Sequence, residues 1–418
     1  MSKPRQREPH ELLLLAGMAR ALEAMMDDVS CAKRRVWIES YIVRDDRLGT
    51  RLAAALAAAV KRGADVRLLF DALGSKNTPA AFVDELRGKG IRVELYRRLR
   101  AFPLGVFPRD HSRIVVTDDS AYTGGSAWGD EWLPVEDGGK GWHDVCLRMR
   151  GPCVSDLVEI FEDRWAEARG EPDRRPRSVV RQHADLTVVS DIALGAHRIY
   201  ELHLTAVRRA KRRIWIENSY FFPPLPLLDA LAAAAQRGVD VALLLPGETD
   251  LPSVTRAARG EYAKWLERGI RIAELQRTVL HSKIAVIDDD WCTIGTFNIN
   301  SVSVACAHEL NVFVIEPTFV SRVAAQIEAD FSESKQLTRE DVRRWPWLTR
   351  AVRFLAAVAF RSLEALLARR VPRLLWSEAA TEKPDEETPT GEVSDPAAVP
   401  DESRRLERGL QASVAEEE

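Results

Sequence analysis

The chain contains the segment AKRRVWIESYIVR at residues 32–44 and the closely similar AKRRIWIENSYFF at residues 210–222. Two further pairs follow in the same order: RLAAALAAAVKRGADVRLLFD (51–71) with LLDALAAAAQRGVDVALLLPG (227–247), and HSRIVVTDD (111–119) with HSKIAVIDD (281–289). Two unrelated α/β domains could share the same order of strands and helices. They would not both carry a basic and aromatic segment that ends in Ile-Glu at the first of these strands. The chain is therefore interpreted as an internal duplication.

Each copy has the same predicted elements. A strand rich in β-branched and aromatic residues precedes an Ala/Leu-rich helix, which ends at Gly63 or Gly238, and a second apolar strand follows. This alternation indicates βαβ units and predicts a largely parallel sheet in each half. The expected fold class is α/β, with two similar αβα domains that form a pseudo-dimer within one chain.

Composition changes along the chain set the expected domain boundaries. The stretch RGEPDRRPRSVVRQH, from residue 169, is polar and rich in Arg and Pro, which is typical of a linker. We expect a first half at 1–168, a linker at 169–189, a second half at 190–340, an amphipathic segment at 341–376 and a disordered acidic tail at 377–418.

The bulk properties exclude some classes of protein. The 418 residues are 46% hydrophobic and carry a formal net charge of −3, so the chain as a whole does not attract nucleic acid, and no nucleic-acid partner is expected. The five cysteines are scattered along the chain and lack the spacing of metal ligands: Cys31, Cys146, Cys153, Cys292 and Cys306. This pattern fits a reducing compartment.

No segment offers the roughly 18 consecutive apolar residues that a membrane-spanning helix needs. We therefore expect a protein of the cytoplasm or a peripheral protein on the cytoplasmic side of the cell membrane. The segment WPWLTRAVRFLAAVAFRSLEALLARRVPRLLW at 345–376 has excess arginine and tryptophans at both ends. This pattern favours a helix in the membrane interface, and the alternative is a helix packed on the protein's own core.

The third repeated segment carries the chemistry. The second half has His281-Ser-Lys283, then Asp288 and Gly-Thr-Phe-Asn at 295–298. The first half has His111-Ser-Arg113, followed by Asp118 and Gly-Gly-Ser at 124–126. One match to H-x-[KR]-x4-D is only suggestive, but two matches in register with an independent repeat are strong evidence of a shared site.

The spacing suits phosphodiester chemistry. Side chains at positions i and i+2 leave a strand on the same face, so each histidine is expected beside its cation. One histidine can attack phosphorus while the other protonates the departing alkoxide. The cations neutralise the non-bridging oxygens, and the amide of Asn298 can donate to one of them. These groups need no metal, and no cofactor is expected.

These motifs resemble those of the phospholipase D superfamily, over roughly residues 33–328. The bacterial cardiolipin synthase branch, in its cardiolipin synthase B-like form, is especially similar. Four segments carry that closer resemblance: Glu39-Ser-Tyr-Ile, Trp142-His-Asp144, Asn218-Ser-Tyr220 and Glu309-Leu-Asn311.

The resemblance implies a covalent phosphohistidine intermediate and transfer between two phosphatidylglycerols, which gives cardiolipin and glycerol. It implies a phospholipid substrate and binding to the membrane surface through the Trp/Arg segment. The implied catalytic residues are His111, Arg113, Asp118, His281, Lys283 and Asp288, and the implied substrate-binding residues are Asn298, Gly125, Thr296 and Glu309. Glu309 is expected to orient a histidine. For Asp118 and Asp288, capping of the turn after each strand is preferred to direct catalysis.

The first motif departs from the family pattern twice. Arg113 replaces the usual lysine, and Ala127 stands where an asparagine matching Asn298 would be. Arginine keeps the charge but has a planar fork in place of a compact ammonium. Which histidine is the nucleophile stays open. So do three other activities: a hydrolytic phospholipase D, a nuclease of the same superfamily, and a non-catalytic phospholipid-binding protein.

Overall fold

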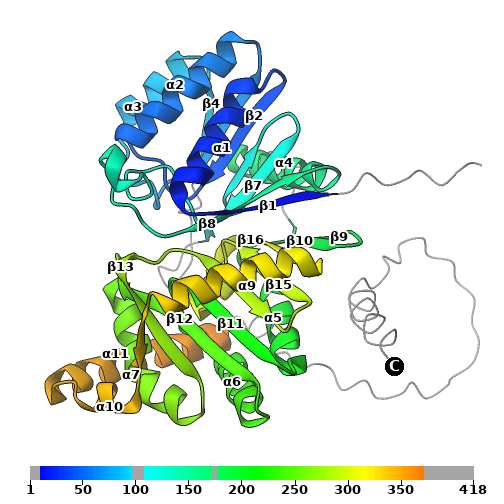
Figure 1. Cartoon of the computed structure of the whole chain (residues 1–418). Coiled ribbons are helices and arrows are strands. Elements are labelled where there is room, and N and C mark those ends of the chain that lie inside the picture. The colour runs from blue at the N-terminus through cyan, green and yellow to red at the C-terminus, as the bar shows by residue number, and fades with distance from the viewer. Residues whose placement is uncertain (1–9, 97–107, 172–176, 371–418) are drawn as a thin grey trace, which may run out of the picture. The chain divides into compact units, whose positions relative to one another are not determined.

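A computed structural model describes residues 10–96, 108–171 and 177–370 of the chain. Over these residues the chain folds into two mixed β-sheets with helices against them, one sheet in each half (Figure 1). The predicted tail at 377–418, together with Arg373 and Trp376, lies outside the described residues.

The first half contains a seven-stranded sheet with strand order β1-β8-β7-β6-β2-β3-β4. Its elements are β1 (Glu11–Ala16), α1 (Met18–Cys31), β2 (Arg35–Ser40), α2 (Arg47–Lys61), β3 (Asp65–Asp71), α3 (Ala80–Gly88), β4 (Arg92–Tyr96), β5 (Arg109–Asp110), β6 (Ile114–Val116), β7 (Ser120–Gly124), the 3-10 turn η1 (Val135–Asp137), β8 (Val145–Arg150) and α4 (Cys153–Arg169).

The second half contains a larger sheet with strand order β17-β13-β12-β11-β14-β15-β16-β10-β9. Its elements are β9 (Val179–Gln182), β10 (Leu186–Asp191), α5 (Arg198–Arg209), β11 (Arg213–Asn218), α6 (Leu225–Gln236), β12 (Asp240–Glu248), α7 (Pro252–Glu267), β13 (Arg271–Val279), β14 (Lys283–Ile287), β15 (Trp291–Gly295), α8 (Ser301–Cys306), β16 (Ala307–Val314), α9 (Pro317–Ser332) and β17 (Lys335–Leu337).

The two sheets have the same topology, as the duplication predicts. Read from one edge, β4-β3-β2-β6-β7-β8-β1 corresponds strand by strand to β13-β12-β11-β14-β15-β16-β10. The repeated AKRR segments lead into β2 and β11, the central strands of the two sheets. Each half is thus the same α/β unit, and the predicted fold class is confirmed.

The expectation of largely parallel sheets is wrong. The pairs β2–β3 and β3–β4 are parallel, but β6, β7, β8 and β1 pair antiparallel with their neighbours. The reason lies in the connections. A helix separates β2 from β3, whereas only residues 117–119 separate β6 from β7, and so short a connection permits only an antiparallel hairpin.

Part of the predicted linker at 169–189 is sheet. Helix α4 ends at Arg169, and β9 and β10 then form a hairpin on the outer edge of β16, with Val188 opposite Val312. The polar residues indicated a loop, but the alternating apolar side chains from Val179 onward are those of an edge hairpin. The described part of this connection therefore belongs to the second sheet.

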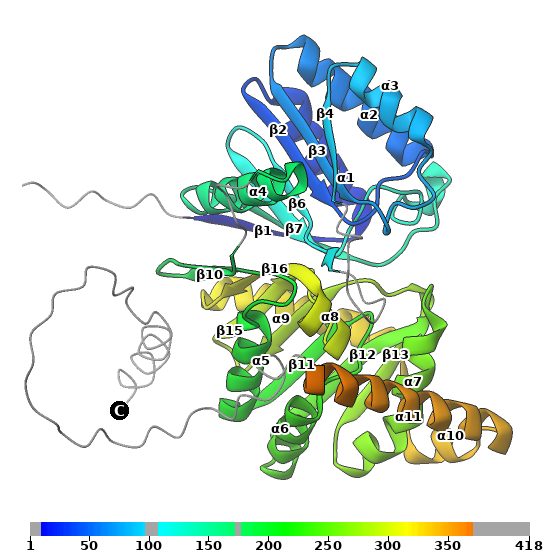
Figure 2. The same cartoon turned by 180° about the vertical axis from the view of Figure 1, so that it is seen from behind.

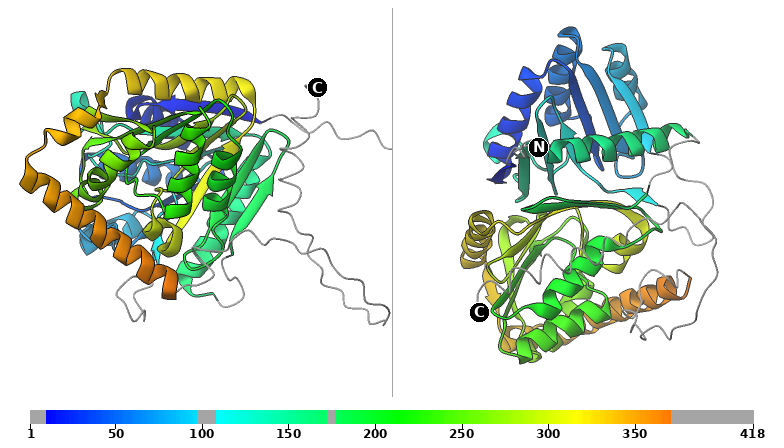
Figure 3. Two further views of the ribbon diagram at one scale, coloured as in Figure 1. Left: turned by 90° about the horizontal axis from the view of Figure 1, so that it is seen from below. Right: turned by 90° about the vertical axis from the view of Figure 1, so that its right-hand side faces the viewer.

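The two halves share a buried apolar core. One cluster contains Leu147 and Phe161 from the first half and Val286, Val312 and Val323 from the second. In the side view of Figure 3, α4 of the first half lies directly over strands of the second half, and contacts between α4 and β10 agree with this. Because these side chains are buried against each other, neither half keeps its core intact alone.

Two helices follow the second sheet, α10 (Arg339–Arg343) and α11 (Trp347–Arg370). Helix α11 packs along α7 and lies close to α8, across one end of the second half (Figures 2 and 3). Gly260 of α7 permits this close crossing, because a Cβ there would lie 2.3 Å from the carbonyl oxygen of Arg353. The predicted segment at 341–376 therefore contains a helix that is packed on the protein.

A buried carboxylate anchors the far part of α11. Glu364 is 3% exposed, and its Oε1 accepts the backbone N–H of Leu225 at the start of α6, at 3.2 Å. Its other oxygen accepts Arg361 Nη1 at 2.8 Å, and the same nitrogen donates to the carbonyl oxygen of Pro223. An acid at the N-terminus of a helix satisfies free N–H groups and favours the helix dipole, so α11 and α6 hold each other in place.

Two arginines of α11 contact the protein itself: Arg361 pairs with Glu364, and Arg353 stacks on Trp345 with its guanidinium carbon 3.8 Å from the ring centroid. Helix α11 also exposes several large apolar side chains: Trp347, Leu348, Val352, Phe354, Leu355, Val358 and Leu366. Among the described helices, none is both long and apolar enough to cross a bilayer.

Candidate active site

The two motif histidines meet where the halves contact each other. His111 follows β5, which pairs with β16 of the other half, and its backbone N–H donates to the carbonyl oxygen of His308 at 3.0 Å. His281 precedes β14, and its N–H donates to the carbonyl oxygen of His143 at 2.7 Å. Each histidine is thus held by the backbone of the opposite half.

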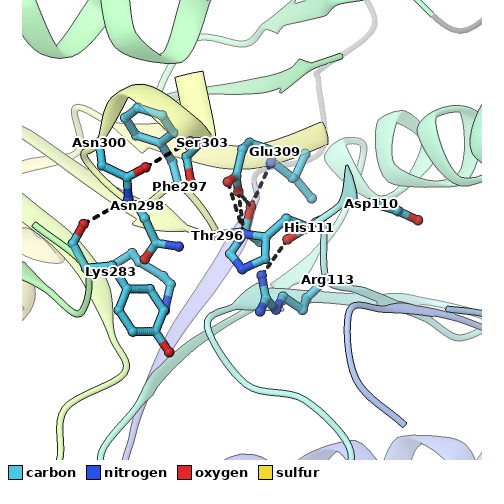
Figure 4. A network of polar contacts seen from close by, with 12 residues as sticks. Asp110, His111, Arg113, Lys283, Thr296, Phe297, Asn298, Asn300, Ser303 and Glu309 are labelled. Atoms are coloured by element: carbon cyan, nitrogen blue, oxygen red, sulfur yellow. Dashed lines mark hydrogen bonds and ion pairs between the residues drawn. The ribbon is translucent and has the colours of Figure 1, made fainter. Parts of the chain in front are cut away.

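The acid beside each histidine also comes from the opposite half. His111 Nδ1 lies 3.0 Å from Glu309 Oε1, and His281 Nδ1 lies 2.9 Å from Asp144 Oδ2. Figure 4 shows the first of these pairs, with Thr296 against the same carboxylate. Because Nδ1 of each ring faces an acid, the Nε2 atom is the one left for substrate. Glu309, which was expected to orient a histidine, lies beside His111.

The two acids titrate differently. Burial raises the pKa of Glu309 to about 8, despite its contacts with Thr296 and Arg113. Burial also acts on Asp144, but His281, Lys283 and the indole N–H of Trp132 lower its pKa below the usual value. The two histidine–acid pairs are therefore related by the duplication but are electrostatically unequal.

A cation accompanies each histidine. Lys283 Nζ lies 2.9 Å from Ser219 Oγ and 3.1 Å from His281 Nδ1, and Arg113 Nη1 donates to the carbonyl oxygen of His111. Burial lowers the pKa of Lys283 to about 7, whereas an arginine stays charged at any physiological pH. An anionic phosphate would bring Lys283 back to its charged form, because opposite charges favour ionisation.

The residues expected to bind substrate divide into two groups. Asn298 faces the cavity described below, and its Oδ1 accepts Ser219 Oγ at 2.9 Å, which orients the amide. Thr296 and Gly125 instead support the acids. The hydroxyl of Thr296 donates to Glu309, and a Cβ at Gly125 would lie 2.6 Å from Asp144 Oδ1. Glycine is therefore needed for Asp144 to reach His281.

Asp118 and Asp288 contact the backbone at the start of the central strands. Asp118 accepts the N–H groups of Lys33, Arg34 and Arg35 at 2.8–2.9 Å, through its two oxygens. Asp288 accepts those of Lys211, Arg212 and Arg213 at 2.7–3.1 Å. Both carboxylates therefore bind the backbone of the repeated AKRR segments. These contacts support the capping alternative.

Asp144 and the tyrosines around the site had no predicted role. Asp144 follows His143 as Glu309 follows His308, each pair at the start of the corresponding strand, so aligning the two halves would have identified it. The ring of Tyr41 meets His111 edge-on at 5.0 Å, and that of Tyr220 meets His281 at 5.8 Å. Tyr41 follows β2 in the segment Glu39-Ser-Tyr-Ile, and Tyr220 follows β11 in the segment Asn218-Ser-Tyr220.

A cavity of about 730 Å³ opens beside His111. Its lining includes His111, Asn298, Tyr41 and Tyr220. It lies beyond the carboxyl ends of β2, β3, β11 and β12, where ligands of α/β sheets commonly bind. Its size is in the range of small-molecule sites.

Three buried side chains of the kinds that bind metal ions lie together. His143, Glu217 and Asp330 each present a possible ligand atom within 4.8 Å of the others. Asp330 also accepts Arg277, and Ser282 donates to Glu217. Burial alone would lower the pKa of His143, but hydrogen bonds and charges from Asp330 and Glu217 raise it to about 10. The protonated imidazole therefore occupies the place that a cation would take between these acids.

Known proteins resemble the chain in sequence. The family described as "Cardiolipin synthase, PLD-like domain" matches residues 25–132 and 204–333. Cardiolipin synthase B of Salmonella typhi is 30% identical over 86% of this chain and 90% of its own length. Cardiolipin synthase 2 of Bacillus anthracis is 31% identical over 75% of this chain, and this chain spans 63% of that protein.

The fold also matches a solved structure. Phosphatidylserine synthase of Haemophilus influenzae superposes with a TM-score of 0.68 over 85% of this chain and 94% of that one. The sequence identity is 13%, so this likeness concerns the fold.

Replacement of Asp288 should lower stability without removing activity. Asp288→Ala leaves three N–H groups at the start of β11 without their acceptor, and loss of a comparable cap costs about 1–2 kcal/mol. Asp288→Asn keeps one acceptor oxygen and should lose less. Urea unfolding and turnover per folded molecule measure both effects. Loss of turnover in a fully folded Asp288→Asn variant would instead make Asp288 a catalytic residue.

Acid should destabilise the protein through His281. Burial and the charge of Lys283 lower the pKa of His281 from 6.5 to about 4. The stability linked to this group is thus fully present above pH 6.5 and is lost as the pH falls toward 4, by about 3 kcal/mol in all. His281→Gln should lose correspondingly less stability than wild type between pH 7 and pH 4.5 in urea unfolding. Equal losses in the two proteins would contradict a neutral, buried His281.

Proposed function

The chain belongs to the family of phospholipase D-like cardiolipin synthases, and we propose that it joins two phosphatidylglycerol molecules into cardiolipin and releases glycerol. The observation that carries this proposal is the pair of crossed histidine–acid contacts, His111 with Glu309 and His281 with Asp144, beside a cavity large enough for a lipid headgroup.

The first step breaks one phosphodiester bond. The Nε2 atom of one motif histidine attacks the phosphorus of phosphatidylglycerol, and a nitrogen–phosphorus bond forms as the bond to the glycerol oxygen breaks. The other histidine, which carries a second proton on Nε2 when the anionic phosphate is bound, gives that proton to the glycerol oxygen, so glycerol leaves neutral. The product on the enzyme is a phosphatidyl-histidine. The acid behind each ring holds its Nδ1 proton and orients the ring throughout.

The second step reverses the roles. The terminal hydroxyl of a second phosphatidylglycerol gives its proton to the histidine that has just lost one, and its oxygen attacks phosphorus. The nitrogen–phosphorus bond breaks, and cardiolipin is released. Arg113, Lys283 and the amide of Asn298 stabilise the charge on the non-bridging oxygens in both steps.

The choice between transfer and hydrolysis depends on the exclusion of water. The motif histidines are 8% and 3% exposed, and the rings of Tyr41 and Tyr220 cover them edge-on. A lipid that fills the cavity would displace the remaining water and leave its own hydroxyl as the nearest nucleophile. This favours the transferase over the hydrolytic alternative.

We further propose that the protein is peripheral to the cell membrane, on its cytoplasmic side. Leu348, Val352 and Leu355 lie at helical spacing on α11 and are exposed together with Trp347 and Phe354; we call these five side chains the apolar face. Exposed apolar side chains on one helix are typical of interfacial binding. The five free thiols suit the reducing side of the membrane.

Purified protein incubated with phosphatidylglycerol vesicles, without added metal, should form cardiolipin and equimolar glycerol. His111→Ala and His281→Ala should each lower the rate by more than about a thousandfold, because each removes either the nucleophile or the acid. Lipid products and free glycerol are quantified together. Phosphatidic acid in place of cardiolipin would identify a hydrolase. No turnover at all would support the non-catalytic alternative.

Charges on the apolar face should release the protein from membranes. The double variant Leu348→Asp/Leu355→Asp removes two side chains that together stabilise membrane binding by a few kcal/mol, so vesicle affinity should fall at least about tenfold. Flotation with phosphatidylglycerol-containing vesicles measures this. Val135→Asp, at an exposed apolar residue of the first half, is the matched control. Equal flotation of the double variant and wild type would remove α11 as the membrane contact.

A further inference from the structure

Helix α11 lines the same cavity as the motif histidine His111. Phe360, Leu363 and Leu367 of α11 form part of the cavity wall, and His111 and Asn298 line the cavity as well. The sequence places α11 beyond both matched parts of the family, which end at residue 333. A helix outside the duplicated unit therefore completes the candidate active site.

The wall that α11 faces is also apolar. Val254 of α7, Leu251 before it and Val302 of α8 line the same cavity near α11. The cavity lining thus combines polar side chains, among them those of His111 and Asn298, with aliphatic and aromatic side chains. A ligand that contacts both kinds of side chain carries a charged or polar group joined to an apolar part.

The apolar wall is fixed in position. The contacts of Glu364 with α6 and of Arg361 with Pro223 lie on the same turns of α11 as Leu363. The ring of Phe360 meets that of Phe222 at 5.5 Å between centroids. A rigid wall can discriminate ligands by length and volume, because its side chains cannot move aside at low cost.

We propose that α11 is the acyl-chain-binding wall of the active site, and that Phe360, Leu363 and Leu367 contact a fatty acyl chain of the phospholipid whose phosphate lies at His111. This inference rests on the proposed function and deepens it, because it names the residues that select the chain. Leu363 is half-buried and lies between Phe360 and Leu367 in this wall, so the size of its side chain limits the space for the acyl chain.

The apolar face described above adjoins this wall on the same helix. With 100° per residue, Leu348, Val352, Leu355 and the exposed Leu366 fall on one stripe of α11, next to the side that carries Leu363. Apolar side chains therefore continue around the helix from its solvent side to the cavity. An acyl chain that follows this surface from a bilayer to the site exposes less apolar area to water than it would beside polar side chains.

The test compares dioctanoyl and dipalmitoyl phosphatidylglycerol in the same detergent micelles. Leu363→Trp fills part of the space beside α11, so its ratio of rates should shift toward the dioctanoyl lipid by about tenfold or more, the size expected for a changed hydrophobic pocket. Leu363→Ala enlarges the same space and should shift the ratio toward the dipalmitoyl lipid. Ala365→Trp adds the same ring on the exposed, nearly opposite side of α11 and should keep the wild-type ratio.

The outcomes separate the two proposals. A wild-type ratio in Leu363→Trp, with cardiolipin still formed, would overturn the acyl-chain wall and leave the proposed function intact. If Leu363→Trp were inactive with both lipids, a wild-type ratio in Leu363→Ala would overturn the acyl-chain wall as well. If wild type formed no cardiolipin from either lipid, the proposed function would fall.

Binding can be tested without turnover. Phosphatidylglycerol with a photoactivatable diazirine in its acyl chain should label the segment 360–367 of wild type in micelles. The label there should fall several-fold in Leu363→Trp and stay unchanged in Ala365→Trp. Labelling confined to the apolar face, at residues 347–355, would overturn the proposal even in an active enzyme.

Discussion

The structure depends on two carboxylates that each reach across to a histidine of the other half. Asp144 and Glu309 are buried, and so are the rings of His281 and His111 that they contact. Buried polar groups are stable only when their partners are in place, so these contacts fix the distance and the register between the two halves. The shared core around Phe161 and Val312 then follows, because the sheets must approach closely enough for the acids to reach. These contacts also require glycine at position 125, because any side chain there would displace Asp144.

Charge is unevenly distributed over this symmetric frame. Lys283 loses much of its charge to burial, whereas Arg113 in the equivalent place keeps its charge. Arg113 is always charged, whereas Lys283 is only partly charged when the site is empty. A bound phosphate would favour the charged form of Lys283 and so increase the positive charge of the site. The departure of the first motif from lysine therefore has a physical use. Ala127, the other departure, is buried in the apolar core of the first half, so only the second half presents an amide, through Asn298.

Much of this arrangement could be predicted from the sequence, because a duplication shows itself in paired motifs. The fold class and the two histidines, each with its cation, were predicted from residues that recur at matching points, and Glu309 was included through the family resemblance. The mixed sheets were not predicted, because strand direction depends on connection lengths that hydrophobic patterns do not report. Asp144 was missed because an acid carries no signal until the two halves are aligned; its partner lies 137 residues away and is near only after folding. The two faces of α11 were hidden for a similar reason, since one apolar helix can serve a membrane, a core or a cavity equally well.

The crossed contacts also bear on how such a chain could have arisen. A single half standing alone would hold its histidine without the acid that orients it. Two identical copies related by a twofold axis would restore both pairs, since each surface would complement itself. Joining the copies in one chain makes the site independent of protein concentration and frees each half to change without its twin. The arginine in one motif and the lysine in the other, and the lone Asn298, are the kind of divergence that a symmetric assembly of identical subunits cannot have.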